Sequence, residues 1–292
     1  MIYAFIQAHP EHAVARWAPF LEVSTSGYYA WLQERESRQA RKDDYCAQVQ
    51  RIFDQSGGTY GADRVAGQLR KDGFSASFKK VKRIMNEQGL FSVHLRYQRS
   101  LTDSRGVRDE DCPNLLRDVP GNRPFQALSS DITYIPTQEG FAYTCTIRDL
   151  RSGVVLAEQT ASRMKKELVL DTLRSAVKGW KLEKGTIFHS DRGSQYTSEA
   201  VRERLRAYGF RQSFSRTGKP GDNTWSESFY SILKKELVHP IGRFRTREEA
   251  AQGIFAFIHS FYNTQRIQKC LGYLSPMEWL NRYYNSTLKI SA

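Results

Sequence analysis

The sequence predicts an α/β protein with a mixed five-stranded sheet, preceded by an all-α helix-turn-helix region. Before residue 99 the apolar residues recur at helical spacing, whereas after residue 124 β-branched runs alternate with helical patterns. Residues 100–123 are dominated by Asp, Arg, Pro and Gly without an apolar period, which is typical of a linker. The expected parts are therefore a helical DNA-binding region at 1–99, a linker at 100–123, a catalytic core at 124–238 and a helical C-terminal extension at 239–292.

The composition restricts the class of function. The chain has 292 residues, a net charge of +13 and a pI near 9.6, so its expected partner is a polyanion, nucleic acid first of all. No run approaches the roughly 20 apolar residues that a membrane-spanning helix needs. The four cysteines form no CxxC pair, which argues against a disulfide framework or a four-thiolate zinc site. The N-terminus lacks the basic region of a signal peptide, and we expect a cytoplasmic protein.

The positive charge is concentrated between Arg64 and Arg99. This stretch holds nine basic residues and two acidic ones. Its net charge of +7 is more than half of the chain's +13. Its pattern predicts a helix over 62–71 that stops at Gly73, and a second helix over 77–88 with a serine as its N-cap. The two helices would form a helix-turn-helix.

The second of these helices has the features of a recognition helix. Its apolar residues form one inward stripe, and its basic residues lie on the opposite face. A solvated basic face on a packing helix has the same pattern, but the helix-turn-helix layout in a basic chain favours DNA contact. The residues expected to contact DNA are Lys79, Lys82, Arg83 and Asn86.

A weaker pattern of helix, turn and helix lies further upstream. Helices are expected over 15–20 and 28–34, with Ser24 or Ser26 as the N-cap of the second. The aromatic residues of this segment serve equally well as plain core residues, so its role stays open between DNA contact and packing.

Beyond residue 124 three antiparallel strands are followed by helices and strands in alternation. Apolar and β-branched runs separated by turn-forming residues predict the strands, and helical periodicity predicts the rest. The order βββαβαβα is that of a ribonuclease-H-like fold. The expected strands cover 126–135, 141–148, 153–159, 186–189 and 210–214, and the expected helices cover 161–178, 198–208 and 222–237.

Three acidic residues occupy positions from which they can meet. Asp131 lies inside the first strand, Asp191 just past the fourth, and Glu227 on the last helix. Because the first strand is central and the fourth lies beside it, the two aspartates should converge at one end, where the helix brings Glu227 across. Each acid also has an ordinary explanation, as a strand-edge charge, a turn residue and a solvated helix residue respectively.

Three clustered carboxylates would repel one another unless cations neutralise them. Mg²⁺ prefers oxygen ligands and keeps positions open for water and phosphate oxygens. We therefore expect two Mg²⁺ (or Mn²⁺) ions, about 3.5–4 Å apart, that promote an in-line displacement at phosphorus.

Further residues near these acids are candidates for DNA contact. Lys234 lies two helical turns after Glu227, so a cation that can hold a phosphate shares its face. Residues 218–223 form a glycine-containing basic loop, in which Lys219 and Asn223 are the candidates. Beyond the C-terminal helix, Arg266 is a candidate for lining a DNA channel, with a plain surface role as the alternative.

Several motifs spread over the chain form a recognisable combination. They are Ser-Asp-Ile-Thr-Tyr-Ile at 130–135, His-Ser-Asp-Arg-Gly-Ser-Gln-Tyr at 189–196, Asp-Asn-Thr-Trp-Ser-Glu-Ser-Phe at 222–229, Leu-Lys-Lys-Glu-Leu at 233–237 and Tyr-Asn-Thr-Gln-Arg at 262–266. Asp191 and Glu227 are separated by 35 residues. With these motifs the chain resembles the integrase-core transposases of the bacterial insertion-sequence-three family, which are DDE transposases related to retroviral integrases.

The resemblance implies an enzyme in which Asp131, Asp191 and Glu227 bind metal and Lys234 contacts DNA. Such transposases cut one strand at the element's end with water, and the freed 3′ hydroxyl then attacks another phosphodiester. The implied partners are double-stranded DNA, further copies of the chain on that DNA, and the product of an upstream reading frame. Two other hypotheses stay open: a non-catalytic DNA-binding regulator and a ribonuclease-H-type nuclease that hydrolyses without joining.

Overall fold

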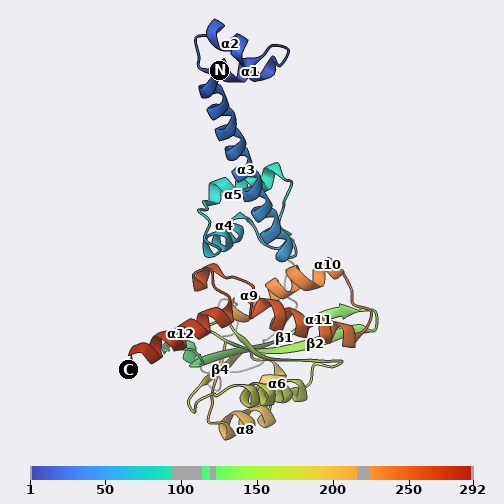
Figure 1. Cartoon of the computed structure of the whole chain (residues 1–292). Helices are drawn as coiled ribbons and strands as arrows, with labels where there is room; N and C mark the ends of the chain where they lie inside the picture. The colour runs from blue at the N-terminus through green and yellow to red at the C-terminus, as the bar shows by residue number, and fades with distance from the viewer. Residues whose placement is uncertain (1, 94–113, 119–122, 216–223, 291–292) are drawn as a thin grey trace. The chain divides into compact units, whose positions relative to one another are not determined.

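The computed structural model describes residues 2–93, 114–118, 123–215 and 224–290, without the side chains of residues 117–118, 224–226 and 288–290. The chain divides into two compact units, Met1–Ser92 and Val93–Ala292, each described here by itself (Figure 1). No helix of the described part is long and apolar enough to cross a membrane.

The first unit is helical throughout, and one long helix runs through it. The Ser24 hydroxyl accepts from the Gly27 N–H (2.9 Å) and so caps α3 (Thr25–Gln55), which decides between the two predicted caps in favour of Ser24 over Ser26. The helix does not end near residue 34 as expected, because no Gly or Pro interrupts residues 28–55. The other helices are α1 (Ile2–Ala8), α2 (Val14–Phe20), α4 (Ala62–Lys71) and α5 (Phe78–Glu87).

The predicted helix pair is present as α4 and α5, which pack on each other and on α3. The Ser77 hydroxyl accepts from the Lys80 N–H (3.3 Å) and caps α5. Val65 and Leu69 of α4 and Val81 and Ile84 of α5 are buried, as their spacing predicts. The polar face of α5 is thereby left in solvent.

The second unit is built on a five-stranded mixed sheet with the order β3-β2-β1-β4-β5. β1 pairs antiparallel with β2 and parallel with β4, so it is the central strand, and β4 pairs parallel with β5. This topology confirms the predicted ribonuclease-H-like fold. The strands are β1 (Ala127–Thr137), β2 (Gly140–Asp149), β3 (Val155–Ala161), β4 (Ile187–Ser190) and β5 (Arg211–Phe214).

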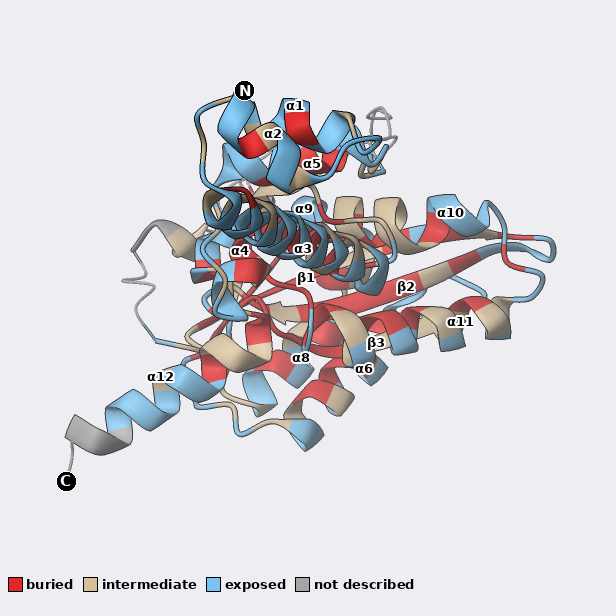
Figure 2. Cartoon of the chain, turned by 45° about the horizontal axis from the view of Figure 1, so that its top comes forward, coloured by how far each residue is buried: buried red, intermediate tan, exposed pale blue. Residues whose placement is uncertain are grey.

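Each face of the sheet is covered by helices and carries its own apolar core (Figures 1 and 2). One core joins α6 (Lys166–Gly179), α7 (Ser194–Thr197) and α8 (Glu199–Ala207) to residues such as Leu128 and Phe188. The other joins α9 (Thr224–Leu233), α11 (Arg247–Ala256) and the π-helical turns η3 (Lys234–Val238) and η4 (Phe257–Tyr262) to Ile135. The predicted helix over 222–237 thus changes to a π-helix at Lys234. The remaining helices are α10 (His239–Ile241), η5 (Lys269–Leu271) and α12 (Pro276–Ile290).

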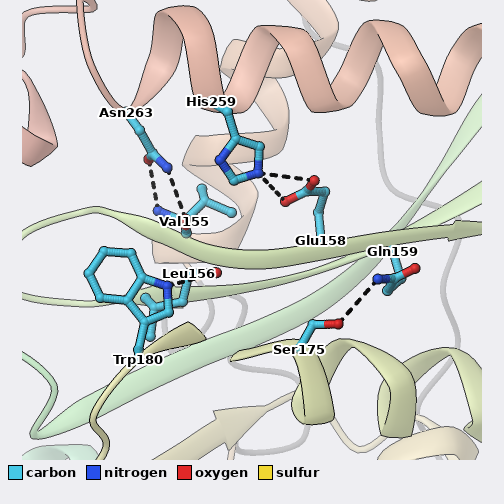
Figure 3. Close-up of polar contacts among 8 residues, drawn as sticks. All are labelled: Val155, Leu156, Glu158, Gln159, Ser175, Trp180, His259 and Asn263. Carbon is cyan, nitrogen blue, oxygen red and sulfur yellow. Dashed lines mark hydrogen bonds and ion pairs between the residues drawn. The ribbon is translucent and has the colours of Figure 1, made fainter. Parts of the chain in front are cut away.

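The edge strand β3 is held by side chains from both layers (Figure 3). Asn263 accepts from the Val155 N–H (3.0 Å) and donates to the Val155 carbonyl (2.9 Å). On the other side the Trp180 indole donates to the Leu156 carbonyl (2.9 Å). These bonds satisfy backbone groups that an edge strand otherwise leaves unpaired.

Part of the predicted linker packs on the core. Residues Leu115–Asp118 form a 3₁₀ turn, η1, and the Leu115 N–H donates to the Ser213 hydroxyl of β5 (2.9 Å). Residues 94–113 and 119–122 of this segment lie outside the described residues.

Arg266 corrects one sequence-based prediction. Its side chain is buried, with the residue 1% exposed, and its guanidinium makes two hydrogen bonds of 2.7 Å to the carboxylate of Glu236. Because the guanidinium is buried and bonded to the Glu236 carboxylate, Arg266 does not line a DNA surface. It holds η3, the turn that begins with Lys234, against the segment that follows η4.

Removing one member of this buried pair should destabilise the core strongly. We expect Arg266→Ala to lower the free energy of unfolding by about 3–5 kcal/mol, because Glu236 is left buried without its cation. Urea denaturation of the full chain measures this change. The control is Arg206→Ala, which breaks an exposed pair with Glu199 (3.1 Å) and should cost about 1 kcal/mol or less. Equal losses in the two variants would contradict the structural role.

Candidate active site

Asp131 and Asp191 occupy matching positions on neighbouring strands. The parallel ladder of β1 and β4 pairs Ser129 with His189, and each aspartate lies two residues further along its own strand direction. β4 ends at Ser190, so Asp191 is the first residue beyond it, while β1 continues past Asp131. The predicted convergence of the two strand positions at the carboxyl end of β4 is therefore present.

Asp191 is a largely buried carboxylate in a tight turn. Burial raises the pKa of its side chain, and the Gly193 N–H, which donates to Oδ1 (3.0 Å), opposes this shift. No ion pair to Asp191 is formed within the described residues. A buried carboxylate without an ion pair is stabilised either by taking up a proton or by binding a cation.

The loop after β4 is fixed from β5. The buried His189 ring lies between the hydroxyls of Ser213 (2.8 Å from Nδ1) and Ser215 (3.2 Å from Nε2). The Arg192 side chain is also buried, and its Nε donates to the Ser215 carbonyl (2.8 Å). Arg192 therefore supports the turn from the interior, and this role has no local signal in the sequence.

Two buried tyrosines surround the strand segment that carries Asp131. The Tyr196 hydroxyl lies 3.0 Å from that of Ser130, and its pKa is raised well above the usual value by burial, with contributions from Asp131 and Asp191. Both aspartates are therefore within electrostatic range of one buried hydroxyl. On the opposite side, the Tyr230 hydroxyl of α9 donates to the Asp131 carbonyl (2.5 Å). Sequence reasoning did not identify either tyrosine.

Glu227 lies in the first turn of α9, on its exposed side. Within the described residues, no three His, Cys, Asp or Glu side chains are close enough together to hold one metal ion. The structure thus brings the strand positions of the two aspartates together, and it does not gather the Glu227 carboxylate with them.

Lys234 is half-buried near Asp131. Its ammonium lies 4.4 Å from the ring centroid of Tyr134, which itself is partly exposed. Burial lowers the pKa of Lys234, and the negative charge of Asp131 opposes this shift. Lys234 therefore lies within electrostatic range of Asp131.

The residues predicted for DNA contact on α5 form an exposed polar face. Lys79, Lys82, Arg83 and Asn86 are all exposed, and Arg83 makes a long, exposed ion pair with Glu87 (3.6 Å). The predicted contacts Lys219 and Asn223 lie outside the described residues.

The oxygen donors at the end of β4 match what a divalent cation needs. Mg²⁺ and Mn²⁺ take carboxylate ligands, and Asp131 and Asp191 supply two from adjacent strands. The buried state of Asp191 and its raised pKa give a cation a favourable place. Asp131 and Asp191 are therefore the residues that would hold a metal ion at this edge, and Lys234 nearby forms no carboxylate ion pair in the described part of the chain.

Comparison with protein families matches both units. An integrase core domain matches residues 121–220 and a second integrase core domain model matches residues 227–284. An HTH-like domain matches residues 40–99, which include α4 and α5. The two integrase core matches together cover more than half of the chain.

Among curated proteins, the chain is similar to the transposase for insertion sequence element IS904 of Lactococcus lactis, with 35% identity over 87% of this chain and all of that protein. It is 33% identical to transposase InsF for insertion sequence IS3A of Escherichia coli, over 97% of this chain and 99% of that protein. Among solved structures, the catalytic core domain of BIV integrase is similar at 16% identity, covering 56% of this chain and 99% of that one with a TM-score of 0.43.

These relatives decide the family. Both transposases are matched over nearly their whole length at identities above 30%, by a chain that carries integrase core and HTH-like domains. Membership implies DNA binding and DNA transposition. The chain belongs to the insertion-sequence-three (IS3) family of transposases and is an enzyme of the DDE transposase and integrase class.

Proposed function

We propose that this transposase cuts one DNA strand at the end of its element with water, and then joins the freed 3′ hydroxyl to a second phosphodiester. Asp131, Asp191 and Glu227 are the proposed metal ligands. The single observation that carries the proposal is the matched register of Asp131 and Asp191, two residues beyond the Ser129–His189 pair. Both steps are displacements at phosphorus, so one site can serve them in turn.

The chemistry depends on divalent cations. Two Mg²⁺ (or Mn²⁺) ions, when bound, would polarise the attacking oxygen and stabilise the leaving oxygen. The donor set of three carboxylates suits these ions, and the buried Asp191 supports the assignment because its ionised form lacks a cationic partner among the described residues.

The chain's own residues would orient the substrate. Lys234 is proposed to hold a phosphate next to the carboxylates. Its ammonium lies over the Tyr134 ring and close enough to Asp131 for the charge of that carboxylate to affect the pKa of the lysine. Glu227 is proposed as the third ligand, carried by the helix that Tyr230 attaches to Asp131.

Recognition of DNA is assigned to the exposed face of α5. Lys79, Lys82, Arg83 and Asn86 share that face, and Lys219 and Asn223 are retained as candidate contacts near the site. Because two element ends must be brought together, we include a homo-oligomer on DNA in the proposal.

Replacing any of the three acids should stop catalysis. We expect Asp131→Asn, Asp191→Asn and Glu227→Gln each to reduce joined products more than about 100-fold, since even outer-shell partners of metal ligands cost 10–100-fold. Labelled end DNA, separated on a denaturing gel, distinguishes cut from joined strands, and a mobility shift measures binding, which should persist.

Matched controls for these variants lie on α6. Asp171→Asn and Glu167→Gln make the same chemical changes at exposed positions and should leave joining unchanged. Cutting without joining in the wild type would instead indicate a nuclease, and tight binding without cutting at any metal concentration would indicate a regulator.

Metal binding should be visible in the stability of Asp191 variants. Burial raises the Asp191 pKa, so above that pKa the ionised group destabilises the metal-free folded state, and Asp191→Asn should raise the unfolding midpoint at pH 7. Added Mg²⁺ should raise the unfolding midpoint of the wild type and should not raise that of Asp191→Asn. At a Mg²⁺ concentration of 100 times the Kd, the wild type should gain about 2.7 kcal/mol in free energy of unfolding. Thermal unfolding with EDTA and with Mg²⁺ tests both statements, and equal Mg²⁺ shifts would refute them.

DNA binding should depend on salt through the α5 face. Each lysine that neutralises a phosphate of the duplex adds about 0.9 to the steepness with which log affinity falls against log salt. Lys79→Ala with Lys82→Ala should therefore make this slope shallower by about 2 if both lysines bind phosphates. The control pair Lys181→Ala with Lys184→Ala removes the same charge from an exposed part of the core and should leave the slope nearly unchanged. Fluorescence anisotropy at several salt concentrations measures it.

A further inference from the structure

Tyr230 joins two segments that each carry a proposed metal ligand. It lies on α9, three residues after Glu227, and is 5% exposed. Residues three apart on a helix are neighbours on its surface, so Tyr230 and Glu227 lie within one turn of each other. The tyrosine ring points into the core on that side of the sheet, where it contacts Phe229.

The Tyr230 hydroxyl is bonded to the central strand β1 and to its neighbour β2. It donates to the Asp131 carbonyl (2.5 Å), with the Thr144 carbonyl at 3.2 Å as a second acceptor. The Thr146 hydroxyl is 3.0 Å away, and Thr146 is the residue that β2 pairs with Asp131. The hydroxyl therefore lies at the point of the β1–β2 ladder where Asp131 stands.

These contacts define a mechanical link between the ligands. The apolar neighbours on α9, Phe229 and Leu233, are buried and pack without directional bonds. Such packing opposes separation of the helix from the sheet, but it opposes movement of the helix along the strand only weakly. A hydrogen bond to one carbonyl fixes the position of the helix along the strand. We propose that Tyr230 is a positioning residue that sets Glu227 relative to Asp131, an inference that rests on the proposed function.

The protonation state of Tyr230 suits this role. Burial raises its pKa well above the usual value, and the nearby Asp131 charge adds to the shift. This direction is consistent with the hydrogen bond that the hydroxyl donates to the Asp131 carbonyl.

A second tyrosine in the same core shows that this bond is specific to Tyr230. Tyr262 on η4 is fully buried in the same apolar cluster and contacts Phe229. Its hydroxyl has no hydrogen-bond partner among the described residues. Tyr230→Phe and Tyr262→Phe thus remove the same atom from the same core, and only the first removes a bond to the Asp131 strand.

The experiment compares these two variants in the full chain. We expect Tyr230→Phe to bind end DNA like the wild type, to join strands about 10–100-fold more slowly, and to need about 10-fold more Mg²⁺ for half of the thermal stabilisation. Tyr262→Phe should match the wild type in all three measurements. Thr146→Val, which leaves the Tyr230–Asp131 bond in place, should show a smaller change in the same direction.

The outcomes separate this inference from the function on which it rests. An unchanged Mg²⁺ midpoint in Tyr230→Phe, or equal losses in Tyr230→Phe and Tyr262→Phe, would overturn the positioning role. Asp131→Asn is measured in parallel. If that variant keeps both joining and the Mg²⁺ shift, the proposed function itself fails; if it loses both while Tyr230→Phe keeps both, only the positioning role fails. Should Tyr230→Phe not fold, the test passes to Thr146→Val, because the Thr146 hydroxyl (3.0 Å) helps to hold the Tyr230 hydroxyl at the Asp131 carbonyl. A Mg²⁺ midpoint in Thr146→Val equal to that of Tyr262→Phe would then overturn the inference.

Discussion

The parallel pairing of β1 with β4 is the constraint on which the site depends. It places Asp131 and Asp191 in the same row of the sheet, although 59 residues separate them in the chain. The Asp191 carboxylate is largely buried, and this burial raises its pKa and disfavours its charged form. The apolar cores on both faces of the sheet offset the cost of burying Asp191, and in the proposed function a divalent cation would offset the rest.

Around this pair, each supporting element is attached by a buried polar contact. Ser213 and Ser215 hold the His189 ring at the end of β4, and the Tyr230 hydroxyl holds α9 to β1. Glu236 and Arg266 hold the π-helical turn that begins with Lys234. Apolar packing supplies most of the stabilisation, but it is not directional, so the directional bonds determine where the catalytic candidates stand.

The two kinds of charge in the chain are separated by their surroundings. On α5 the cations are exposed on a polar face, where they can reach phosphates and where salt screens them. Near the sheet, Asp191 is largely buried and Lys234 is half-buried. Burial raises the pKa of Asp191 and lowers that of Lys234, so it favours the neutral form of each side chain. One basic sequence therefore holds both an exposed, salt-screened set of cations on α5 and a small group of partly buried charges beside the sheet.

Local patterns were sufficient for the strand order, the N-caps at Ser24 and Ser77, and the candidacy of Asp131 and Asp191, because periodicity and capping involve residues a few positions apart. They failed for α3, whose polar middle has no apolar stripe, and for Arg266, which looked like a surface cation. Arg266 meets Glu236 across 30 residues and Tyr230 meets Asp131 across 99, and such contacts leave no repeating signal in the chain. Burial of these side chains is a property of the assembled layers, so only the folded molecule reveals which polar residues hold the site together.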